Sequence, residues 1–296
     1  MDIHQRAILE LVRAALAEDI GKGDLTSLGC LEPNPMKAEI VAKSDGILSG
    51  VRPARLTFEI VDSANRVTFE QNDGSPFRKG DVIARIDGFN QTVLSSERVA
   101  LNFLGHLSGV ASLTAAFVEK VKGTGARILD TRKTTPGWRC LEKKAVVHGG
   151  GVNHRYGLYD MILIKDNHIA SAGSIKKAVA MAREFLGTAD FRLQFETEAE
   201  EIQIEVEVTS ESELTEAIEA GVNRLLLDNQ TVDSLAGLAA LARKLNSSVE
   251  LEASGNVNLD NVAAIAGTGV DFISIGALTH SAPGSDFSLN VTGSPA

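Results

Sequence analysis

The stretch IEVEVTSESELTEAIEAGVNRLLLDN, residues 204–229, joins two apolar runs of strand length through a segment of helical period. The runs IEVEV and RLLLDN are rich in branched side chains, as buried strands are, and the helical segment between them closes at Gly221. Two strands joined by a helix predict a βαβ unit, in which the strands lie parallel and the helix covers the sheet.

The same alternation recurs from about residue 126 onward. Helical segments are expected at 175–187, where Ser174 provides the N-cap, and at 231–246. The other apolar runs are ARILD, DMILIKD, VELEAS and DFISIGA. Continuously apolar strands between helices predict a parallel α/β fold. Because no GxGxxG motif follows the first run, the pattern favours a barrel over a dinucleotide-binding sheet, although an open sheet also fits it.

The first 110 or so residues have a different pattern. An amphipathic helix is expected at the start, with Ile8, Val12 and Leu16 on one face. Three β-rich segments with turn signals follow it: MKAEIVAKSDGILSG, RVTFEQND and FRKGDVIARIDG. Residues 97–123 then predict a long helix that leads into the α/β region.

Bulk properties exclude several classes of protein. A net charge of -10 argues against general binding of nucleic acid or anionic membranes, because both need a positive field. No apolar run is expected to approach membrane length. The two cysteines, Cys30 and Cys140, are too few for a disulfide framework, so a reducing cytoplasm is the expected location.

One segment departs from this acidic balance. Residues 128–165 contain seven Lys and Arg against three Asp and Glu, a net of about +4, and two histidines as well. These cations alternate with Gly, Pro and strand residues instead of lining a helix, which favours a ligand site over a solvated basic face. The segment therefore predicts a small polyanionic ligand.

Polar residues follow the apolar runs where each predicted strand ends. In parallel α/β folds the carboxyl ends of the strands meet at one edge, where ligands bind. The residues at these positions are Thr131, Arg132, Lys133, Lys165, Asp166, Asn167, His168, Glu207, Asp228, Asn229, Ser254, Gly255 and Gly276. The ligand site is therefore expected at the loops that follow the strands. One of these loops is HGGGVNHRYG, residues 148–157, which carries glycines and cations.

The signs of these charges separate along the chain. The early strand ends supply cations, whereas Glu207 and Asp228 supply carboxylates from neighbouring strands, an arrangement typical of Mg²⁺ held between protein and phosphate oxygens. Ser254, Gly255 and the segment from Gly276 to His280 then offer donors for phosphate. Two anionic ligands are predicted, one of them phosphorylated and accompanied by metal.

At these residues the sequence resembles the quinolinate phosphoribosyltransferase family, also called carboxylating nicotinate-nucleotide pyrophosphorylases. The resemblance implies transfer of the phosphoribosyl group of phosphoribosyl pyrophosphate (PRPP) to quinolinate, with decarboxylation, which gives nicotinate mononucleotide, CO₂ and pyrophosphate for NAD biosynthesis. No organic cofactor is expected. The matching segments are EDIGKGDLTS, SERVALNFLGHLSGVAS, LDTRKTTPG, HGGGVNHRYGLYDMILIKDNHI, IEVEV, LLLDN, LEASGNV and GVDFISIGALTHS.

The resemblance also implies an architecture. It predicts an N-terminal α/β sandwich domain, residues 1–112, and an open seven-stranded parallel α/β barrel, residues 113–283. The C-terminal tail, residues 284–296, is expected to pack on the first domain. A homodimer is implied, in which Arg98 completes the site of the partner subunit.

Residue roles carry over from the matching motifs. Quinolinate is expected to contact Arg98, Arg132, Lys133, His154, Arg155 and Lys165. The donor and its phosphates are expected to contact Lys133, Glu207, Asp228, Ser254, Gly255, Gly276 and His280, with Mg²⁺ at Glu207 and Asp228. Lys133, Lys165, Glu207 and Asp228 form the expected catalytic set.

A longer, acidic segment precedes the strand IEVEV and leaves its alignment less certain. DFRLQFETEAEEIQ, residues 190–203, exceeds the length of the family pattern, so either Glu205 or Glu207 could face the donor. Both lie on one side of the strand, and Glu207 is preferred because it is nearer the carboxyl end.

Three other functions remain open from the sequence. A paralogue on the same scaffold, of the molybdenum-transport-associated type, could use the cationic pocket for another anion. Lys165 at a strand end could serve a barrel lyase as a Schiff-base nucleophile. A non-catalytic phosphate-sensing module is the third. His4, His106 and His148 are expected to be surface or packing residues, and Cys140 to be buried.

Overall fold

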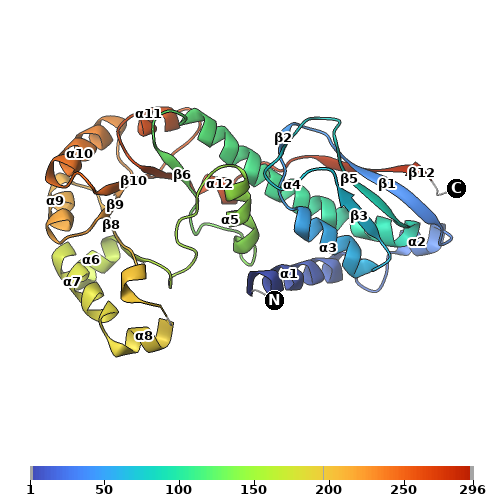
Figure 1. Ribbon diagram of the computed structural model, residues 1–296, viewed down its shortest axis with the longest axis horizontal. Helices are drawn as coiled ribbons and strands as arrows, with labels where there is room; N and C mark the ends of the chain where they lie inside the picture. The colour runs from blue at the N-terminus through green and yellow to red at the C-terminus, as the bar shows by residue number, and fades with distance from the viewer. Residues whose placement is uncertain (1–2, 196, 294–296) are drawn as a thin grey trace. The chain divides into compact units, whose positions relative to one another are not determined.

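The computed structural model describes residues 3–195 and 197–293. The chain divides into two compact units (Figure 1). The N-terminal unit comprises Met1–Ala115, Lys133–Gly151 and Ala277–Ala296, and the barrel unit comprises Ala116–Arg132 and Val152–Gly276. The expected boundaries at residues 112 and 283 stay predictions, and residues 294–296 of the expected tail lie outside the described part.

An antiparallel sheet forms the N-terminal unit. Its strand order is β12-β1-β5-β3, with β1 at Pro35–Ala42, β3 at Arg66–Phe69, β5 at Val82–Phe89 and β12 at Phe287–Gly293. Strand β12 pairs with β1 along its length, from Ala42 opposite Phe287 to Lys37 opposite Gly293. A short pair, β2 (Gly46–Ile47) with β4 (Pro76–Phe77), lies outside this sheet.

Helices cover this sheet and close its core. Helix α3 (Val51–Val61) contributes Phe58 and α4 (Asn90–Lys120) contributes Leu104, both buried with Ile40 of β1. The unit also contains α1 (Ile3–Ile20), α2 (Leu25–Cys30), α5 (Arg139–His148) and α12 (Ala277–His280). The predicted α/β sandwich is confirmed, since helices pack on one antiparallel sheet.

Helix α4 corrects one expectation about membranes. By length and composition alone it could cross a bilayer, although no apolar run was expected to approach that length. Buried residues make up 56% of its apolar window, and Val93, Ala100 and Leu101 belong to the core of the sandwich. Its apolar surface is therefore that of a core helix.

A parallel sheet forms the barrel unit. Its strand order is β6-β11-β10-β9-β8-β7. The strands are β6 (Arg127–Leu129), β7 (Ile162–Ile164), β8 (Ile204–Val208), β9 (Arg224–Asp228), β10 (Glu250–Ser254) and β11 (Phe272–Ser274). The predicted parallel α/β class is confirmed. Because β8, β9 and β10 are parallel neighbours, their carboxyl ends emerge at one edge.

The expected count of seven strands needs a correction. The sheet has six strands in the described residues, and Val152 takes the seventh position as a single parallel bridge to Leu129. Two backbone hydrogen bonds hold it, from Val152 N to Ile128 O at 2.9 Å and from Asp130 N to Val152 O at 3.2 Å. The glycines at 149–151 turn the chain just before Val152, and the predicted site residues His154 and Arg155 follow shortly after it. Only Val152 is therefore left to pair as a strand residue.

Capped helices lie on the outer side of these strands (Figure 1). The Ser174 hydroxyl caps α7 (Ile175–Leu186), Ser210 caps α9 (Glu211–Glu219) and Thr231 caps α10 (Val232–Leu245), as the sequence predicts for the first of them. Helices α6 (Asp166–Ala172) and α11 (Val262–Ala266) belong to the same unit.

The acidic segment before β8 forms structure of its own. It contains α8 (Ala189–Phe195) and a 3₁₀ turn at Ala199–Glu201. Phe191 is buried and stacks on Phe195, with ring centroids 5.2 Å apart, and Phe185 of α7 meets both rings. Aromatic packing therefore anchors this segment to α7.

Candidate functional site

Most of the predicted site residues lie at the carboxyl edge of the barrel unit. Arg132 follows β6, His154 and Arg155 follow the Val152 bridge, and Lys165 follows β7. The remaining barrel residues of the predicted site are Glu207 at the end of β8, Asp228 at the end of β9, Ser254 and Gly255 at the end of β10, and Gly276 after β11. Arg98, Lys133 and His280 belong to the N-terminal unit.

Asp130 ties the first two of these loops together. Its side chain is fully buried, and Oδ1 accepts a hydrogen bond from the backbone N–H of His154 at 2.9 Å. Asp160 shapes the same loop further on, because its carboxylate accepts the N–H groups of Tyr156 and Gly157 at 2.5 and 2.8 Å. The backbone that carries His154 and Arg155 is thus fixed at both ends.

Two guanidinium groups come together between these loops. Arg155 is half-buried and donates from Nη1 to the carbonyl of Met161 at 3.1 Å. Burial lowers the pKa of Arg155, and the positive charge of nearby Arg132 lowers it further. Two neighbouring guanidinium groups that repel each other are suited to an anion with two carboxylates, which would relieve this repulsion.

Lys165 and Glu207 form an ion pair at the ends of adjacent strands β7 and β8. The Lys165 side chain is 45% exposed and that of Glu207 is 11% exposed, so the pair opens toward solvent on the lysine side. His168 is engaged locally, because its Nδ1 accepts the backbone N–H of Lys165 at 3.0 Å.

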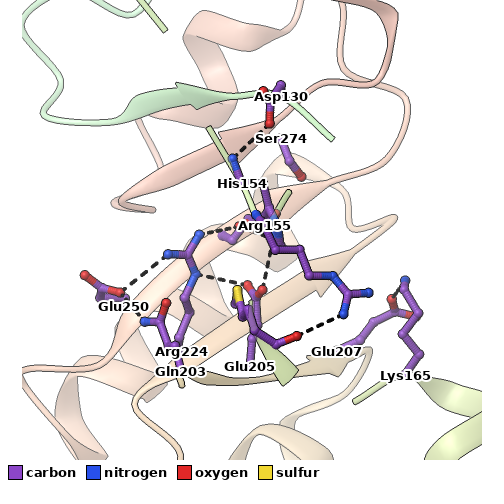
Figure 2. A network of polar contacts seen from close by, with 12 residues as sticks. Asp130, His154, Arg155, Lys165, Gln203, Glu205, Glu207, Arg224, Glu250 and Ser274 are labelled. Carbon is purple, nitrogen blue, oxygen red and sulfur yellow. Dashed lines mark hydrogen bonds and ion pairs between the residues drawn. The ribbon is translucent and has the colours of Figure 1, made fainter. Parts of the chain in front are cut away.

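Beneath this edge lies a network of buried charges (Figure 2). Arg224 donates from Nε to Glu205 at 3.3 Å and from Nη2 to Glu252 at 2.8 Å. The Nε2 atom of His154 lies 3.0 Å from Glu205 and 3.4 Å from Glu252. Both carboxylates are fully buried, and Arg224 also packs over the ring of Phe272, 4.3 Å from its centroid.

The network changes the acidity of its members. Burial lowers the pKa of His154, but the hydrogen bonds and charges of Glu205 and Glu252 outweigh it and raise the pKa from 6.5 to about 9. Burial and the charge of Glu252 raise the pKa of Glu205. A protonated His154 and Arg224 together would balance the two carboxylates, so the cluster can be neutral as a whole.

His154, Glu205 and Glu252 also meet the distance requirement for a metal site, with ligand atoms within 4.8 Å of one another. The hydrogen bonds argue against this use. The Nε2 atom of His154 faces the two carboxylates and carries a hydrogen in the protonated ring, and the contact of Nδ1 with the N–H of Arg155 at 2.7 Å places the hydrogen on Nε2 in the neutral ring as well. Without a lone pair on Nε2, and with Arg224 already on both carboxylates, the trio suits a proton rather than a metal ion.

Glu205 and Glu207 therefore occupy different environments on the same face of β8. Glu205 is enclosed by Arg224 and His154, whereas Glu207 reaches Lys165 at the strand ends. This geometry favours Glu207 as the carboxylate that meets a ligand.

The three glycines of residues 149–151 serve packing in the N-terminal unit. A Cβ at Gly149 would lie 2.3 Å from the carbonyl oxygen of Ala111 in α4, and Gly150 has a φ of +85°. The glycines let the chain turn tightly against α4 rather than against a ligand.

The site residues in the N-terminal unit occupy loops and an exposed helix face. The Arg98 side chain is 64% exposed and lies 3.9 Å from Glu97. The carbonyl of Lys133 accepts the hydroxyl of Thr279 at 2.8 Å, which holds its loop beside the helix that carries His280.

Two histidines of this unit have packing roles, as predicted. The Nε2 atom of His106 lies 2.7 Å from the buried Glu142, and the Nδ1 atom of His148 lies 2.8 Å from the hydroxyl of Ser49. Cys140 is buried, also as predicted, whereas the side chain of His4 lies outside the described residues.

Sequence reasoning missed Arg224, Glu252 and Asp130. A signal was present for the first two, because Arg224 opens an apolar strand and Glu252 interrupts another. A charged side chain within a buried strand needs a partner of opposite charge, so each of these two residues predicts such a partner on a neighbouring strand.

Comparisons with known proteins agree over nearly the whole chain. Residues 24–108 match the N-terminal domain and residues 110–290 the C-terminal domain of quinolinate phosphoribosyl transferase. A probable carboxylating nicotinate-nucleotide pyrophosphorylase of Bacillus subtilis is 42% identical over 96% of this chain and 93% of its own. The chloroplastic carboxylating enzyme of rice, Oryza sativa, is 39% identical over 95% of this chain and 76% of its own.

A solved structure agrees with these relatives. The nicotinate-nucleotide pyrophosphorylase of Francisella tularensis superposes with a TM-score of 0.89 at 38% identity, over 97% of this chain and 96% of its own.

Proposed function

The chain belongs to the quinolinate phosphoribosyltransferase family, and we propose that its barrel edge joins quinolinate to the phosphoribosyl group of PRPP, with loss of CO₂. The observation that carries the proposal is the placement of Arg132 and Arg155 after two neighbouring strand positions, β6 and the Val152 bridge, at the carboxyl edge of the sheet, where the charge of Arg132 also lowers the pKa of Arg155. A planar dicarboxylate would pair with both. The products are nicotinate mononucleotide, CO₂ and pyrophosphate, as NAD biosynthesis requires.

Quinolinate binds through the cations of the early loops. Arg132 and Arg155 hold its carboxylates, with His154 behind them and Lys165 beside them. Lys133 and the partner subunit's Arg98 complete this set. On the barrel side His154 is only 7% exposed and contacts Glu205 and Glu252, so it supports the neighbouring Arg155 from below. Desolvating two negative charges in one pocket requires this many fixed donors.

The donor binds along the later strands, at Glu207, Asp228, Ser254, Gly255 and Gly276, and the matching family motifs add Lys133 and His280 to this set. The ring nitrogen of quinolinate forms a bond to C1 of the ribose as the C1–O bond to pyrophosphate breaks and its electron pair leaves with that oxygen. Glu207 or Asp228 stabilises the positive charge that develops on the ribose, and lysines stabilise the leaving group. Catalysis is chiefly positioning and electrostatics.

Decarboxylation follows on the same nucleotide. The C2–carboxylate bond breaks, the positively charged pyridinium ring accepts its electron pair at C2, and a proton replaces the CO₂ there. Lys165, which forms an ion pair with Glu207, lies at this edge and is the proposed donor of this proton. No organic cofactor is needed, because the ring itself is the electron sink.

Magnesium would bind with the donor at Glu207 and Asp228. Their carboxylate oxygens suit this hard cation. The ion would neutralise charge on the departing pyrophosphate. In the present geometry Lys165 pairs with Glu207, so the lysine would shift toward the phosphates when the ion binds.

Two further parts of the proposal concern the assembly and its location. We propose a homodimer, because the exposed Arg98 guanidinium could reach a partner's site. A cytoplasmic location suits the two free thiols, Cys30 and Cys140.

Pyrophosphate release tests the function directly. In the presence of Mg²⁺, the purified protein should release pyrophosphate from PRPP when quinolinate is added. It should release none when nicotinate is added instead or when both acids are left out. Turnover with nicotinate alone would overturn the assignment. Activity on another anion, with none on quinolinate, would instead identify a paralogue on the same scaffold.

A further inference from the structure

Asn229, the residue after Asp228, has an unusual backbone and three polar contacts. Its φ is +51°, in the left-handed region that few residues other than glycine adopt. Its Nδ2 donates to Asp228 Oδ2 at 3.0 Å, and its Oδ1 accepts from Asn256 Nδ2 at 3.2 Å. Its backbone N–H donates to the carbonyl of Ser254 at 2.9 Å. One residue thus touches the ends of both β9 and β10.

The loop after β10 is shaped around this side chain. Gly255 has a φ of +97° and Asn256 a φ of +52°. A Cβ at Gly255 would lie 2.2 Å from Asn229 Oδ1, so the glycine makes room for the amide. Glycine adopts this φ without strain, whereas Asn229 and Asn256 are non-glycine residues in the left-handed region, which surrounding contacts must hold in place.

The next residue extends the connection to β8. Gln230 Nε2 donates to the carbonyl of Thr209 at 3.2 Å and to that of Asp228 at 3.0 Å. Two consecutive amides therefore join the loops that follow β8, β9 and β10, the three strands that carry Glu207, Asp228 and Ser254.

We propose that Asn229 is a positioning residue for the phosphoribosyl donor, whose amide fixes the Asp228 carboxylate and the Ser254–Asn256 loop as one unit. The proposal rests on the proposed function, since it takes this edge to be the donor site. The contact with Nδ2 commits one oxygen of Asp228 and so sets the direction of the other. The contact with Asn256 holds the Gly255 N–H in place for phosphate.

The first test replaces the amide and measures binding by calorimetry. Asn229→Gly, measured alongside, tolerates the same φ and adds no charge. Asn229→Asp keeps the shape and the tolerance for positive φ but loses the donor to Asp228 and places a second negative charge beside that carboxylate. It should raise the Kd of PRPP with Mg²⁺ about tenfold, the value of one hydrogen bond to a charged group, and leave the Kd of quinolinate unchanged. The matched control is Asn246→Asp, because Asn246 pairs with Asn223 at the opposite edge of the same sheet, 3.5 Å apart.

A double-mutant cycle tests the contact itself and serves if Asn229→Asp fails to fold. Gly255→Ala is strained in either background, because its φ is +97° and its Cβ would lie 3.0 Å from the backbone nitrogen of residue 229, but the 2.2 Å collision with Asn229 Oδ1 exists only in the natural chain. Gly255→Ala should therefore weaken PRPP binding more in the natural chain than beside Asn229→Gly. Equal effects in both backgrounds would overturn the positioning role, as would PRPP binding by Asn229→Asp at the level of the control. Failure of the natural chain to turn over quinolinate with PRPP would overturn the proposed function, and this inference with it.

Discussion

Glu205 of β8 and Arg224 of β9 lie directly opposite each other in the parallel sheet, and the Arg224 Nε atom donates to the Glu205 carboxylate at 3.3 Å. A second carboxylate, Glu252 of β10, accepts from Nη2 of the same guanidinium. The interior of the barrel below the site is therefore a layer of paired charges, where aliphatic side chains commonly fill a barrel.

The first prediction concerns the stability of this layer. Glu252→Gln should lower the free energy of unfolding by about 3 kcal/mol, because it leaves Arg224 short of a buried counter-charge. The control is Glu250→Gln on the same strand, whose carboxylate is 44% exposed and 3.8 Å from Arg224. That change should cost less than about 1 kcal/mol.

Urea unfolding followed by far-ultraviolet circular dichroism measures both variants. The fluorescence of Trp138 reports on the N-terminal unit and is unsuitable for this purpose. Equal losses in the two variants would contradict the importance of burial in this network.

The second prediction concerns pH. The folded-state pKa of His154 is raised from 6.5 to about 9 by Glu205 and Glu252, against the effect of burial. A raised pKa means that the protonated ring stabilises the fold fully below pH 6.5 and that this stabilisation is lost as the pH rises through 9. The difference in unfolding free energy between the natural chain and His154→Gln should shrink over that interval.

Nitrogen-15 NMR of the His154 ring measures its protonation state independently of unfolding. The N–H of Arg155 points at Nδ1 and must move aside when a proton binds there. A ring that is neutral at pH 7 would contradict the prediction and show that this N–H outweighs the two carboxylates.

The amino-acid sequence alone predicts most of the fold. Apolar runs between capped helices specify the parallel sheet, because each βαβ unit is a local pattern. The six apolar runs of the sequence correspond to the six observed strands, whereas the seventh strand, which the family resemblance implies, is reduced to the single bridge at Val152. The buried charges show a second limit: Glu205 meets Arg224 only through strand register, which a single sequence does not display.

For a similar reason, the sequence predicts some residues of the candidate site and not others. Polar residues at strand ends are visible in the sequence, so the positions of Lys165, Glu207 and Asp228 at one edge follow from the parallel order. The role of Asn229 depends on its positive φ and on Gly255 of the next loop. Neither the backbone angle nor the contact can be read from the sequence LLLDN.

The third prediction separates the two proposed pockets. Arg132→Ala should raise the Kd of quinolinate about 100-fold, because a bidentate, charge-assisted contact is lost, and leave PRPP binding measurable. Arg132→Lys should recover little, since an ammonium group cannot replace the planar fork. Arg192→Ala in α8 is the matched control, an exposed arginine away from the strand ends. Equal loss of both ligands in calorimetry would mean that the quinolinate pocket lies elsewhere.

The fourth prediction tests whether Arg98 acts across a dimer. Arg98→Ala and Arg132→Ala should each be inactive when alone. In a mixed dimer one barrel retains its own Arg132 and receives an intact Arg98 from its partner, whereas the other barrel lacks both. Random exchange of subunits makes half of the dimers mixed, so pyrophosphate release should return to about a quarter of the natural rate, as two-fold symmetry requires. If the mixture stays inactive although mass spectrometry shows that subunits have exchanged, Arg98 serves its own barrel or none.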